Sequence, residues 1–354
     1  MKLQIFSYKL QFIQAATTSR GSMDFHQVYY IQISDGIKKG IGEAGPLKGL
    51  STDYNTIKDG LKLLAEYYND GAPVQDILIL LNDFPSAKFA FETALYDYNS
   101  GGRYIIYDTP FTSANTPIET NGLVWMADSK TMLDEAFKKA EAGFTTIKFK
   151  VGSLDFDEEC RMIEQLRRYY NSWKITIRLD ANGAFANNDA LEKLKELKRF
   201  DIHSIEQPIK AGHWDLMEEL VSKTPIDIAL DEELIGVNVY NDAEPILKKI
   251  KPHYIILKPT LLGGFTNCEA WVKLAEKYSK GWWSTSALES NIGLNAIAQW
   301  ASKYKSPMPQ GLGTGLLYNN NLLSPLLLHD GHLLYNPAGK WGDLETLEAI
   351  EKEA

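Results

Sequence analysis

The stretch TTIKFKVG, residues 145–152, has the composition of a buried strand, yet it contains two lysines, Lys148 and Lys150. Side chains alternate between the two faces of a strand, so both ammonium groups lie on the same face, on either side of Phe149. If that face is interior, two like charges are held where even one is costly. The rest of the sequence must therefore supply groups that compensate them.

The residues around this stretch alternate between short apolar runs and amphipathic helical segments. From about residue 119 the runs are GLVWMA, TTIKFKV, KITIRLDA, IHSIEQP, IDIALDEE, YIILKPT, WWSTSA and PQGLGTG. Corresponding positions near the run ends recur at intervals of 30, 26, 25, 27, 26 and 28 residues, at Lys150, Asp180, Glu206, Asp231, Lys258, Ser284 and Leu312. Eight strand signals at this pitch predict a parallel β/α barrel. A doubly wound open sheet is the alternative, but it usually has fewer strands, and no glycine-rich phosphate loop occurs.

The first hundred or so residues have another pattern, strands followed by helices. KLQIFSYKLQF, HQVYYIQISD and GIKKGIGEAG are rich in β-branched and aromatic residues, and helical patterns follow at about 54–69 and 86–100. We therefore predict an α+β capping domain over residues 1–118 and a (β/α)7β barrel, a modified TIM barrel, over 119–318. The tail, residues 319–354, is expected to pack back on the cap.

Composition narrows the class of protein. The chain has 354 residues, of which 44% are hydrophobic and 23% charged, enough for a barrel and a smaller domain. The net charge of −9 and the scattered lysines argue against nucleic acid and anionic membranes as partners. Cys160 and Cys268 form no CxxC motif, so neither a disulfide framework nor a cysteine zinc site is expected. No apolar run approaches membrane-spanning length, and the first residues do not resemble a secretory signal, so we expect a cytoplasmic protein.

Charged residues stand at the ends of five successive predicted strands. They are Lys148 and Lys150, then Asp180, Glu206, Asp231 and Lys258. In a β/α barrel these strand ends gather at the face that carries the active site. Three carboxylates there can converge on a hard divalent cation, most simply Mg²⁺, with lysines on opposite sides of it. Mutual repulsion and desolvation are expected to lower a lysine pKa toward the range of a general base.

Each of these residues, taken alone, has an ordinary structural explanation. An Asp or Glu after a strand commonly caps the next helix, and a lone lysine in a strand usually extends to solvent. Capping alone, however, rarely produces a lysine pair, Asp, Glu, Asp and Lys in order at a regular pitch. We therefore interpret the set as a functional site.

Five motifs carry a resemblance to a known family. They are KFK (148–150), RLDANGAF (178–185), IEQPI (205–209), ALDEEL (229–234) and LKPTLLGG (257–264). Together they resemble the enolase superfamily, in its muconate-lactonising-enzyme-like branch, over nearly the whole chain. In enolase-superfamily sites a Lys or His base works with Mg²⁺ on an enediolate. The resemblance therefore implies a capped barrel that abstracts a proton alpha to a carboxylate.

The resemblance also implies individual roles. Three carboxylates would bind Mg²⁺, with Mn²⁺ as a substitute: Asp180, Glu206 and Asp231. Lys150 would be the base, and Lys148 would support it and contact the substrate carboxylate. Lys258 would hold the enolate from the opposite face or act as a second acid or base. Because an α-carboxylate proton is very weakly acidic, the enediolate needs a metal and cations against its oxygens.

Two later segments, STSALESNIGLNAIAQW (284–300) and QGLGTGLLYNNNL (310–322), resemble a dehydratase of menaquinone biosynthesis within this branch. The implied hydro-lyase reaction is syn dehydration of 2-succinyl-6-hydroxy-2,4-cyclohexadiene-1-carboxylate to 2-succinylbenzoate. An N-acylamino acid racemase or a dipeptide epimerase of the same branch is the alternative. QGLGTG lacks the Asp-x-Asp that dipeptide epimerases usually have in the last strand. A catalytically silent barrel acting as a binding protein is the remaining alternative.

Weaker candidates surround the expected site. Arg178 shares the face of Asp180 and would either brace the ligands or form an internal salt bridge. The polar turn TSRGSM (18–23) corresponds to a cap loop that closes over substrate, where Arg20 would meet a carboxylate. Four residues near the start of the helix after the seventh strand would suit the succinyl carboxylate: Ser286, Glu289, Ser290 and Asn291. Helix capping by the last two is the alternative.

Overall fold

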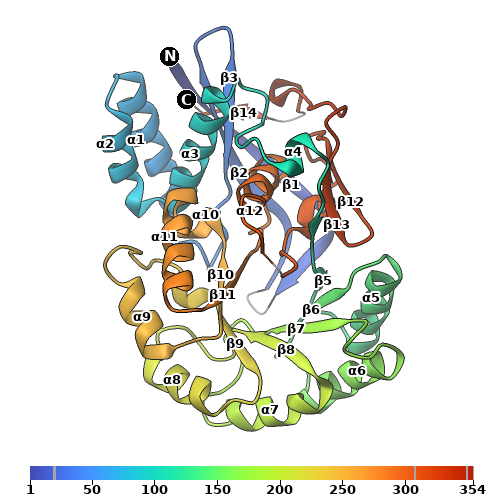
Figure 1. The fold of residues 1–354 in the computed structure, drawn as a ribbon. Coiled ribbons are helices and arrows are strands. Elements are labelled where there is room, and N and C mark those ends of the chain that lie inside the picture. The colour runs from blue at the N-terminus through green and yellow to red at the C-terminus, as the bar shows by residue number, and fades with distance from the viewer. Residues whose placement is uncertain (19–20, 307, 348–349, 354) are drawn as a thin grey trace.

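A long antiparallel hairpin opens the chain in the computed structural model, which describes residues 1–18, 21–306, 308–347 and 350–353 (Figure 1). Strand β1 (Lys2–Thr18) pairs with β2 (Gly21–Ser34), and β3 (Lys39–Ala44) continues the sheet. Near the other end of the chain, β14 (Glu351–Lys352) pairs with the free edge of β1. The two ends of the sequence therefore lie in one small sheet.

Three helices pack on this sheet: α1 (Ile57–Asn69), α2 (Val74–Leu80) and α3 (Pro85–Asn99). The approach of α3 to β3 requires glycine, because a Cβ on Gly42 would lie only 1.9 Å from the carbonyl oxygen of Ala90. A Cβ on Gly40 would meet the carbonyl oxygen of Ala94 at 2.2 Å. This close packing fixes the strand that leads into the loop over the pocket.

Seven parallel strands form the second sheet, in sequence order. They are β5 (Gly122–Val124), β6 (Thr146–Lys150), β7 (Thr176–Asp180), β8 (Ile202–Glu206), β9 (Asp227–Leu230), β10 (Tyr254–Leu257) and β11 (Gly281–Ser284). The helices that accompany them are α5 (Ser129–Glu141), α6 (Phe156–Tyr169), α7 (Ala190–Leu197), α8 (Trp214–Lys223), α9 (Ala243–Ile250), α10 (Pro259–Leu262), α11 (Gly264–Lys277) and α12 (Asn291–Ala301). Figure 1 shows α5 to α9 lining the outside of the curled sheet.

The eighth strand of the barrel consists of isolated pairings. Gln310 bridges to Thr120, beside β5, and Gly311 bridges to Thr285, just after β11. The segment 310–311 therefore joins the two edges of the seven-stranded sheet, and the predicted modified barrel is confirmed. The apolar runs were placed correctly, but the last one is shorter than a full strand.

The remaining elements connect the cap, the barrel and the tail. They are α4 (Pro110–Ser113), β4 (Ile118–Glu119), β12 (Leu326–His329) and β13 (His332–Tyr335). Short 3₁₀ turns occupy Leu81–Asp83, Lys198–Phe200, Glu232–Leu234, Gly313–Leu316 and Leu344–Thr346. Strand β4, which lies just before β5 in the sequence, pairs with β13, and β13 also pairs with β12. The tail is therefore hydrogen-bonded to the segment that leads into the barrel as well as to β1 of the cap.

The register of the parallel sheet places the strand-end charges next to one another. Lys150 of β6 pairs with Asp180 of β7, and Asp180 pairs in turn with Glu206 of β8. Lys148, two residues earlier on β6, faces Arg178. Because side chains two residues apart share a face, one interior layer carries the lysines and carboxylates.

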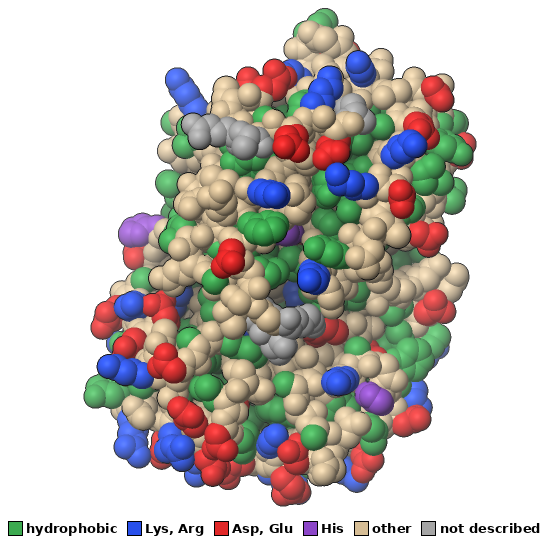
Figure 2. All heavy atoms as spheres, turned by 180° about the vertical axis from the view of Figure 1, so that it is seen from behind, with side chains coloured by type: hydrophobic (Ala, Val, Ile, Leu, Met, Phe, Trp, Pro, Cys, Tyr) green, Lys and Arg blue, Asp and Glu red, His purple; other side chains and the backbone are tan. Residues whose placement is uncertain are grey.

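On the face seen in Figure 2, acidic and basic side chains are interspersed. Within the described residues, none of the helices combines the length and apolar character needed to cross a bilayer. Both cysteines, Cys160 and Cys268, are buried and free.

Candidate active site

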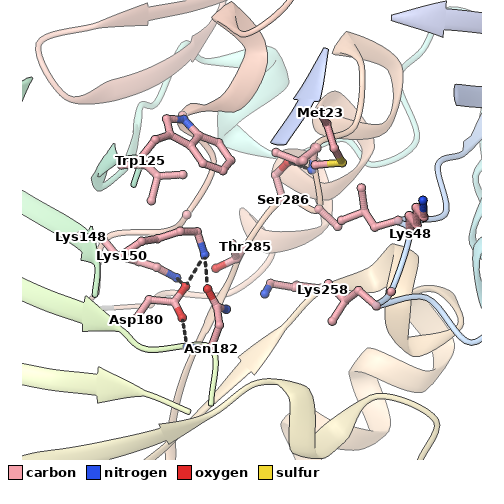
Figure 3. Close-up of a pocket in the computed structure, with 18 of the residues that line it drawn as sticks. Met23, Lys48, Trp125, Lys148, Lys150, Asp180, Asn182, Lys258, Thr285 and Ser286 are labelled. Atoms are coloured by element: carbon pink, nitrogen blue, oxygen red, sulfur yellow. Dashed lines mark hydrogen bonds and ion pairs between the residues drawn. The ribbon is translucent and has the colours of Figure 1, made fainter. Parts of the chain in front are cut away.

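A cavity of about 460 Å³ lies between the carboxyl ends of the barrel strands and the loops of the cap. Its charged end contains Lys148, Lys150, Asp180, Asn182 and Lys258. Its other end is largely apolar and is lined by Met23, Leu47, Leu50, Trp125, Ala287 and Leu288, and Leu123 lines the cavity beside Lys148. Figure 3 shows Lys148 and Lys150 on one side of this space and Lys258 on the other. The cavity therefore suits a molecule with an anionic group at one end and an apolar body.

Two lysines are shared among the three carboxylates. The Lys148 ammonium lies 2.9 Å from Asp180 Oδ2 and 2.6 Å from Glu206 Oε2. On the opposite side, Lys258 pairs closely with Asp231 and lies 3.7 Å from Glu206 Oε1. These links bring the carboxylates of β7, β8 and the end of β9 into one buried network. The convergence expected from the strand pitch is present.

Lys150 completes the network, because its ammonium lies 2.9 Å from Asp180 Oδ2. At most 11% of any of these three lysine side chains is exposed, and at most 2% of any of the carboxylate side chains. Three amines and three carboxyl groups thus balance in number within the barrel mouth, although burial raises the pKa of Asp231 despite the adjacent Lys258. This balance explains how the strand TTIKFKVG can carry a buried lysine pair.

The balance changes one expectation from the sequence, that the lysine pKa values are lowered. Burial does oppose the charged form of Lys148, but the adjacent Asp180 and Glu206 outweigh it, so the pKa of Lys148 is raised. Lys258 follows the same pattern, with burial outweighed chiefly by Asp231 and Glu206, and its pKa is raised. Conversely, the lysines hold the pKa of Asp180 well below its ordinary value despite its burial. The expectation for the lysine pair was wrong for Lys148, because attraction to carboxylates exceeds repulsion between amines.

The carboxylates have the chemistry of a site for a hard divalent cation. Among the described residues, no three carboxylate, imidazole or thiolate groups are arranged as a finished metal site; lysine ammonium groups lie between the carboxylates instead. Glu206 Oε1 is nevertheless buried and accepts no hydrogen bond from the described residues. A buried carboxylate oxygen without a hydrogen-bond donor is suited to bind a cation, so Asp180, Glu206 and Asp231 fit Mg²⁺.

None of the three carboxylates acts as a helix-capping group through its side chain, which was the ordinary alternative. Asp231 immediately precedes the 3₁₀ turn Glu232–Leu234, but its side chain makes no capping hydrogen bond there. It is directed instead to Lys258. The Asp231 side chain, at the end of β9, therefore belongs to the charged network of the site and does not cap the turn.

Arg178 pairs in register with Lys148, but it makes no hydrogen bond or ion pair with the three carboxylates in the part of the chain that the structure describes. Its guanidinium donates to the carbonyl oxygen of Pro309 at 2.8 Å and stacks over the Trp283 ring at 4.0 Å. Burial lowers its pKa to about 10, with Glu206 opposing that shift. Arg178 thus fills the barrel interior and binds the eighth-strand segment. Among the described residues, the Arg178 side chain therefore neither contacts the proposed metal ligands nor forms a salt bridge.

The four residues expected after the seventh strand fall into two groups. Ser286 lines the cavity, but Glu289, Ser290 and Asn291 do not. The carboxylate of Glu289 accepts hydrogen bonds from Thr260 and from the hydroxyl and backbone around Ser286, which fixes the shape of this loop. Ser290 caps α12 by accepting from the backbone N–H of Ile292, so the capping alternative holds for it.

Asn291 is held by the tail, because its side chain donates to the carbonyl oxygen of Leu322 at 2.6 Å. Arg20 lies outside the described residues, so its proposed contact with a carboxylate stays a prediction. Residues 21–23, from the same turn, do line the cavity.

Sequence reasoning missed several residues of the cavity. Lys48 and the apolar side chains of Leu47 and Leu50 come from the loop after β3, and Trp125 follows β5. Asn182 belongs to the motif RLDANGAF, and the sequence predicted no role for it, although it contacts Lys150 directly. A charged residue beside a glycine in a cap loop was the available signal for Lys48, but nothing local indicated which side of the loop faces the barrel.

The fold and the site together define a class of protein, a capped (β/α)7β barrel enzyme with carboxylates and lysines at the barrel mouth. The family model described as "Enolase C-terminal domain-like" matches residues 131–338. The chain belongs to the enolase superfamily, in its muconate-lactonising-enzyme-like branch.

Individual relatives agree with this assignment. The o-succinylbenzoate synthase of Desulfotalea psychrophila is 40% identical, over 94% of this chain and 98% of its own length. The crystal structure of MenC from Desulfotalea psychrophila LSv54 has a TM-score of 0.84 at 37% identity, covering 94% of this chain and 99% of that one. A dipeptide epimerase from Cytophaga hutchinsonii, complexed with Mg and D-Ala-L-Val, has a TM-score of 0.86 at 21% identity, covering 99% and 98%. The last comparison shows a shared fold alone.

A buried carboxylate joins the cap to the rim of the site. Glu43 of β3 accepts hydrogen bonds from the backbone N–H groups of Ser290 and Gly293, at 2.7 and 2.8 Å, in the first turn of α12. It also accepts from the Ser290 hydroxyl at 2.5 Å. Burial raises the pKa of Glu43 to about 7, although these hydrogen bonds act in the opposite direction.

This pKa predicts how stability depends on pH. Between the ordinary value of 4.5 and about 7 the folded protein holds a proton on Glu43 that the unfolded chain has released. The free energy of unfolding therefore falls as pH rises through this range, by at most about 3 kcal/mol from this group. Glu43→Gln removes the titration, so the stability advantage of the wild type over this variant should shrink between about pH 5 and about pH 8.

Urea unfolding at the two pH values measures this difference. Glu345→Gln, which alters an exposed carboxylate paired with Lys39, is the matched control and should show no such trend. A stability difference between wild type and Glu43→Gln that stays constant with pH would contradict the assignment.

Proposed function

We propose that this protein is a Mg²⁺-dependent hydro-lyase that converts 2-succinyl-6-hydroxy-2,4-cyclohexadiene-1-carboxylate to 2-succinylbenzoate in menaquinone biosynthesis. The single observation that carries the proposal is the near full-length similarity to an o-succinylbenzoate synthase, at 40% identity. The lysine and carboxylate network of the barrel mouth supports it chemically, because a carboxylic acid with a very weakly acidic α-proton needs such a site.

In this proposal the metal is held by Asp180, Glu206 and Asp231. When bound, Mg²⁺ supplies positive charge against the carboxylate oxygens of the acid whose proton is removed. Lys148, which already contacts two of the carboxylates, lies where it can donate to a substrate carboxylate oxygen. The charged end of the cavity would therefore bind the ring carboxylate, and the apolar end would accept the ring and succinyl chain.

Lys150 and Lys258 are proposed to act from opposite sides of the bound acid. Lys150 in its neutral form removes the α-proton, so the C–H bond breaks and an N–H bond forms. The electron pair passes through the carboxylate system and returns to expel the 6-hydroxyl group, which leaves as water with the proton that Lys150 carries. Lys258 stays protonated and stabilises the negative charge from the other side. Formation of the aromatic ring makes the step favourable.

A racemase of N-succinylamino acids is the second candidate, and one observation favours it. The amines of Lys150 and Lys258 lie on opposite sides of the site in Figure 3, which is the arrangement that a two-base racemisation requires. Assaying the cyclohexadiene acid and N-succinylamino acids side by side separates dehydration from racemisation.

Three further statements remain proposals. They are the division into domains 1–118 and 119–318, the packing of the tail 319–354 on the cap, and a cytoplasmic location.

Metal removal gives the first prediction of the proposed function. EDTA should abolish turnover, and Mg²⁺ should restore it. Asp231→Asn should weaken Mg²⁺ binding by more than about 100-fold. Loss of a group that only supports a metal ligand costs up to about 100-fold, and loss of a ligand itself should cost more. Isothermal titration with Mg²⁺ measures the affinity. Asp227→Asn, at the other end of β9, is the control and should leave it unchanged. Full turnover in EDTA would contradict the metal proposal.

Substitution of the base gives the second prediction. Lys150→Ala should lower kcat for dehydration by roughly 10²- to 10⁴-fold, because a positioned general base contributes that much. Spectrophotometric assay of 2-succinylbenzoate formation checks it. Lys193→Ala, on α7 outside the cavity, tests for general damage and should retain activity. Undiminished turnover by Lys150→Ala would refute the assignment.

The third prediction concerns the succinyl carboxylate. We propose that Lys48 binds it, since Lys48 is a cavity-lining cation that is separate from the strand-end network and makes no ion pair with the described residues. Lys48→Met should raise KM about tenfold, the effect of losing one charge-assisted contact, with little change in kcat. Lys62→Met, an exposed lysine of α1, is the control. An unchanged KM would exclude Lys48.

A further inference from the structure

Asn182 connects the proposed base to a second carboxylate that is not part of the metal set. Its side-chain oxygen accepts a hydrogen bond from Lys150 at 2.8 Å, and its side-chain nitrogen donates to Glu232 Oε1 at 3.0 Å. Figure 3 shows Asn182 beside Asp180 and facing the Lys150 amine. The residue lines the cavity and is only half-buried, so its side chain belongs to the wall of the site.

The orientation of the Asn182 amide is determined by its two neighbours. A lysine amine can donate to the amide oxygen, whereas a carboxylate can only accept, so the amide nitrogen must face Glu232. An aspartate at this position would place two carboxylates together. A hydrophobic residue would leave Lys150 with one partner fewer.

The backbone of Asn182 is itself in an unusual conformation. Its φ angle is +45°, in the left-handed region that residues other than glycine rarely occupy, and asparagine is among the residues that tolerate it best. Its N–H donates to Asp180 Oδ1 at 3.2 Å, which closes a tight turn directly after β7. The turn is what brings a side chain from position 182 back toward Lys150.

We propose that Asn182 is a positioning residue that holds Lys150 in the rotamer required for proton abstraction. A neutral lysine amine has two N–H groups and one lone pair. When the N–H groups donate to Asp180 Oδ2 and Asn182 Oδ1, as the observed contacts allow, the lone pair is left for the α-proton of the substrate. Loss of the Asn182 contact frees the amine to rotate, and the lone pair loses its direction. The inference rests on Lys150 being the base.

Asn182→Gly tests this proposal with little risk to folding, because glycine adopts a positive φ without strain. We expect kcat to fall about 10- to 100-fold, since misplacement of a reacting group by about 1 Å costs that much. KM and the affinity for Mg²⁺, measured by isothermal titration, should each change by less than about threefold, because the substrate carboxylate and the metal are held by other groups. Asn115→Gly, at an exposed residue with φ of +52°, is the matched control.

An unchanged kcat would overturn the proposal. A fall in Mg²⁺ affinity of tenfold or more would also overturn it, because Asn182 would then act through Asp180. Asn182→Asp, which keeps the shape and the backbone tolerance but sets a charge beside Glu232, should likewise lower kcat.

A crystal structure of the Mg²⁺-loaded Asn182→Gly variant supplies a readout that does not depend on activity. The Lys150 amine should leave its position beside Asp180 or occupy several rotamers, and an unmoved amine would again contradict the proposal. If the wild type fails to dehydrate the cyclohexadiene acid, the proposed function is wrong, whereas this structural result still decides the role of Asn182.

Discussion

The site depends on the mutual compensation of buried lysines and carboxylates across adjacent parallel strands. Neither set is stable alone, because an unpaired buried charge is strongly unfavourable, and removing one partner leaves the other uncompensated. The parallel register solves this by setting Lys150 beside Asp180 and Asp180 beside Glu206 at the same level of the barrel. The arrangement contributes reactivity rather than stability, since an apolar layer of the same volume would cost less to bury. Binding of a divalent cation and an anionic acid would replace some of the lysine contacts and keep the total charge near balance.

Two buried carboxylates of the cap bind the first turns of two barrel helices and so hold the cap against the site. Glu43 accepts from the first turn of α12, and Glu92 of α3 accepts from the backbone N–H groups of Phe265 and Thr266 in the first turn of α11. The N-terminal end of a helix offers unsatisfied N–H groups and a positive dipole, so both contacts are favourable. The Glu43 contact aligns the loop after β3 with the loop after β11, and residues of both loops line the cavity. The pocket thus has one wall from the barrel and one from the cap.

Much of the fold and of the charged site could be predicted from the sequence. The spacing of the apolar runs depends on local periodicity, and the strand ends of a barrel all meet at one face, so Asp180, Glu206 and Asp231 could be placed together without coordinates. Other expectations failed where the answer lies in partners far along the chain. Arg178 has the right face but binds the carbonyl oxygen of Pro309 and the ring of Trp283. Glu289 supports the loop at Ser286 and does not reach the cavity.

The sequence by itself determined the strand pitch, the alternation that puts Lys148 and Lys150 on one face, and the order of charges along the barrel, because these are properties of short segments. Only the tertiary structure decided which charges pair, how the lysine pKa values shift, and which cap residues face the barrel. Those outcomes depend on distances of a few ångströms between segments that are far apart in sequence, as in the contact of Glu43 with Ser290. Electrostatic energy changes steeply at such distances in a buried site, so residue types and spacing alone could not give its sign.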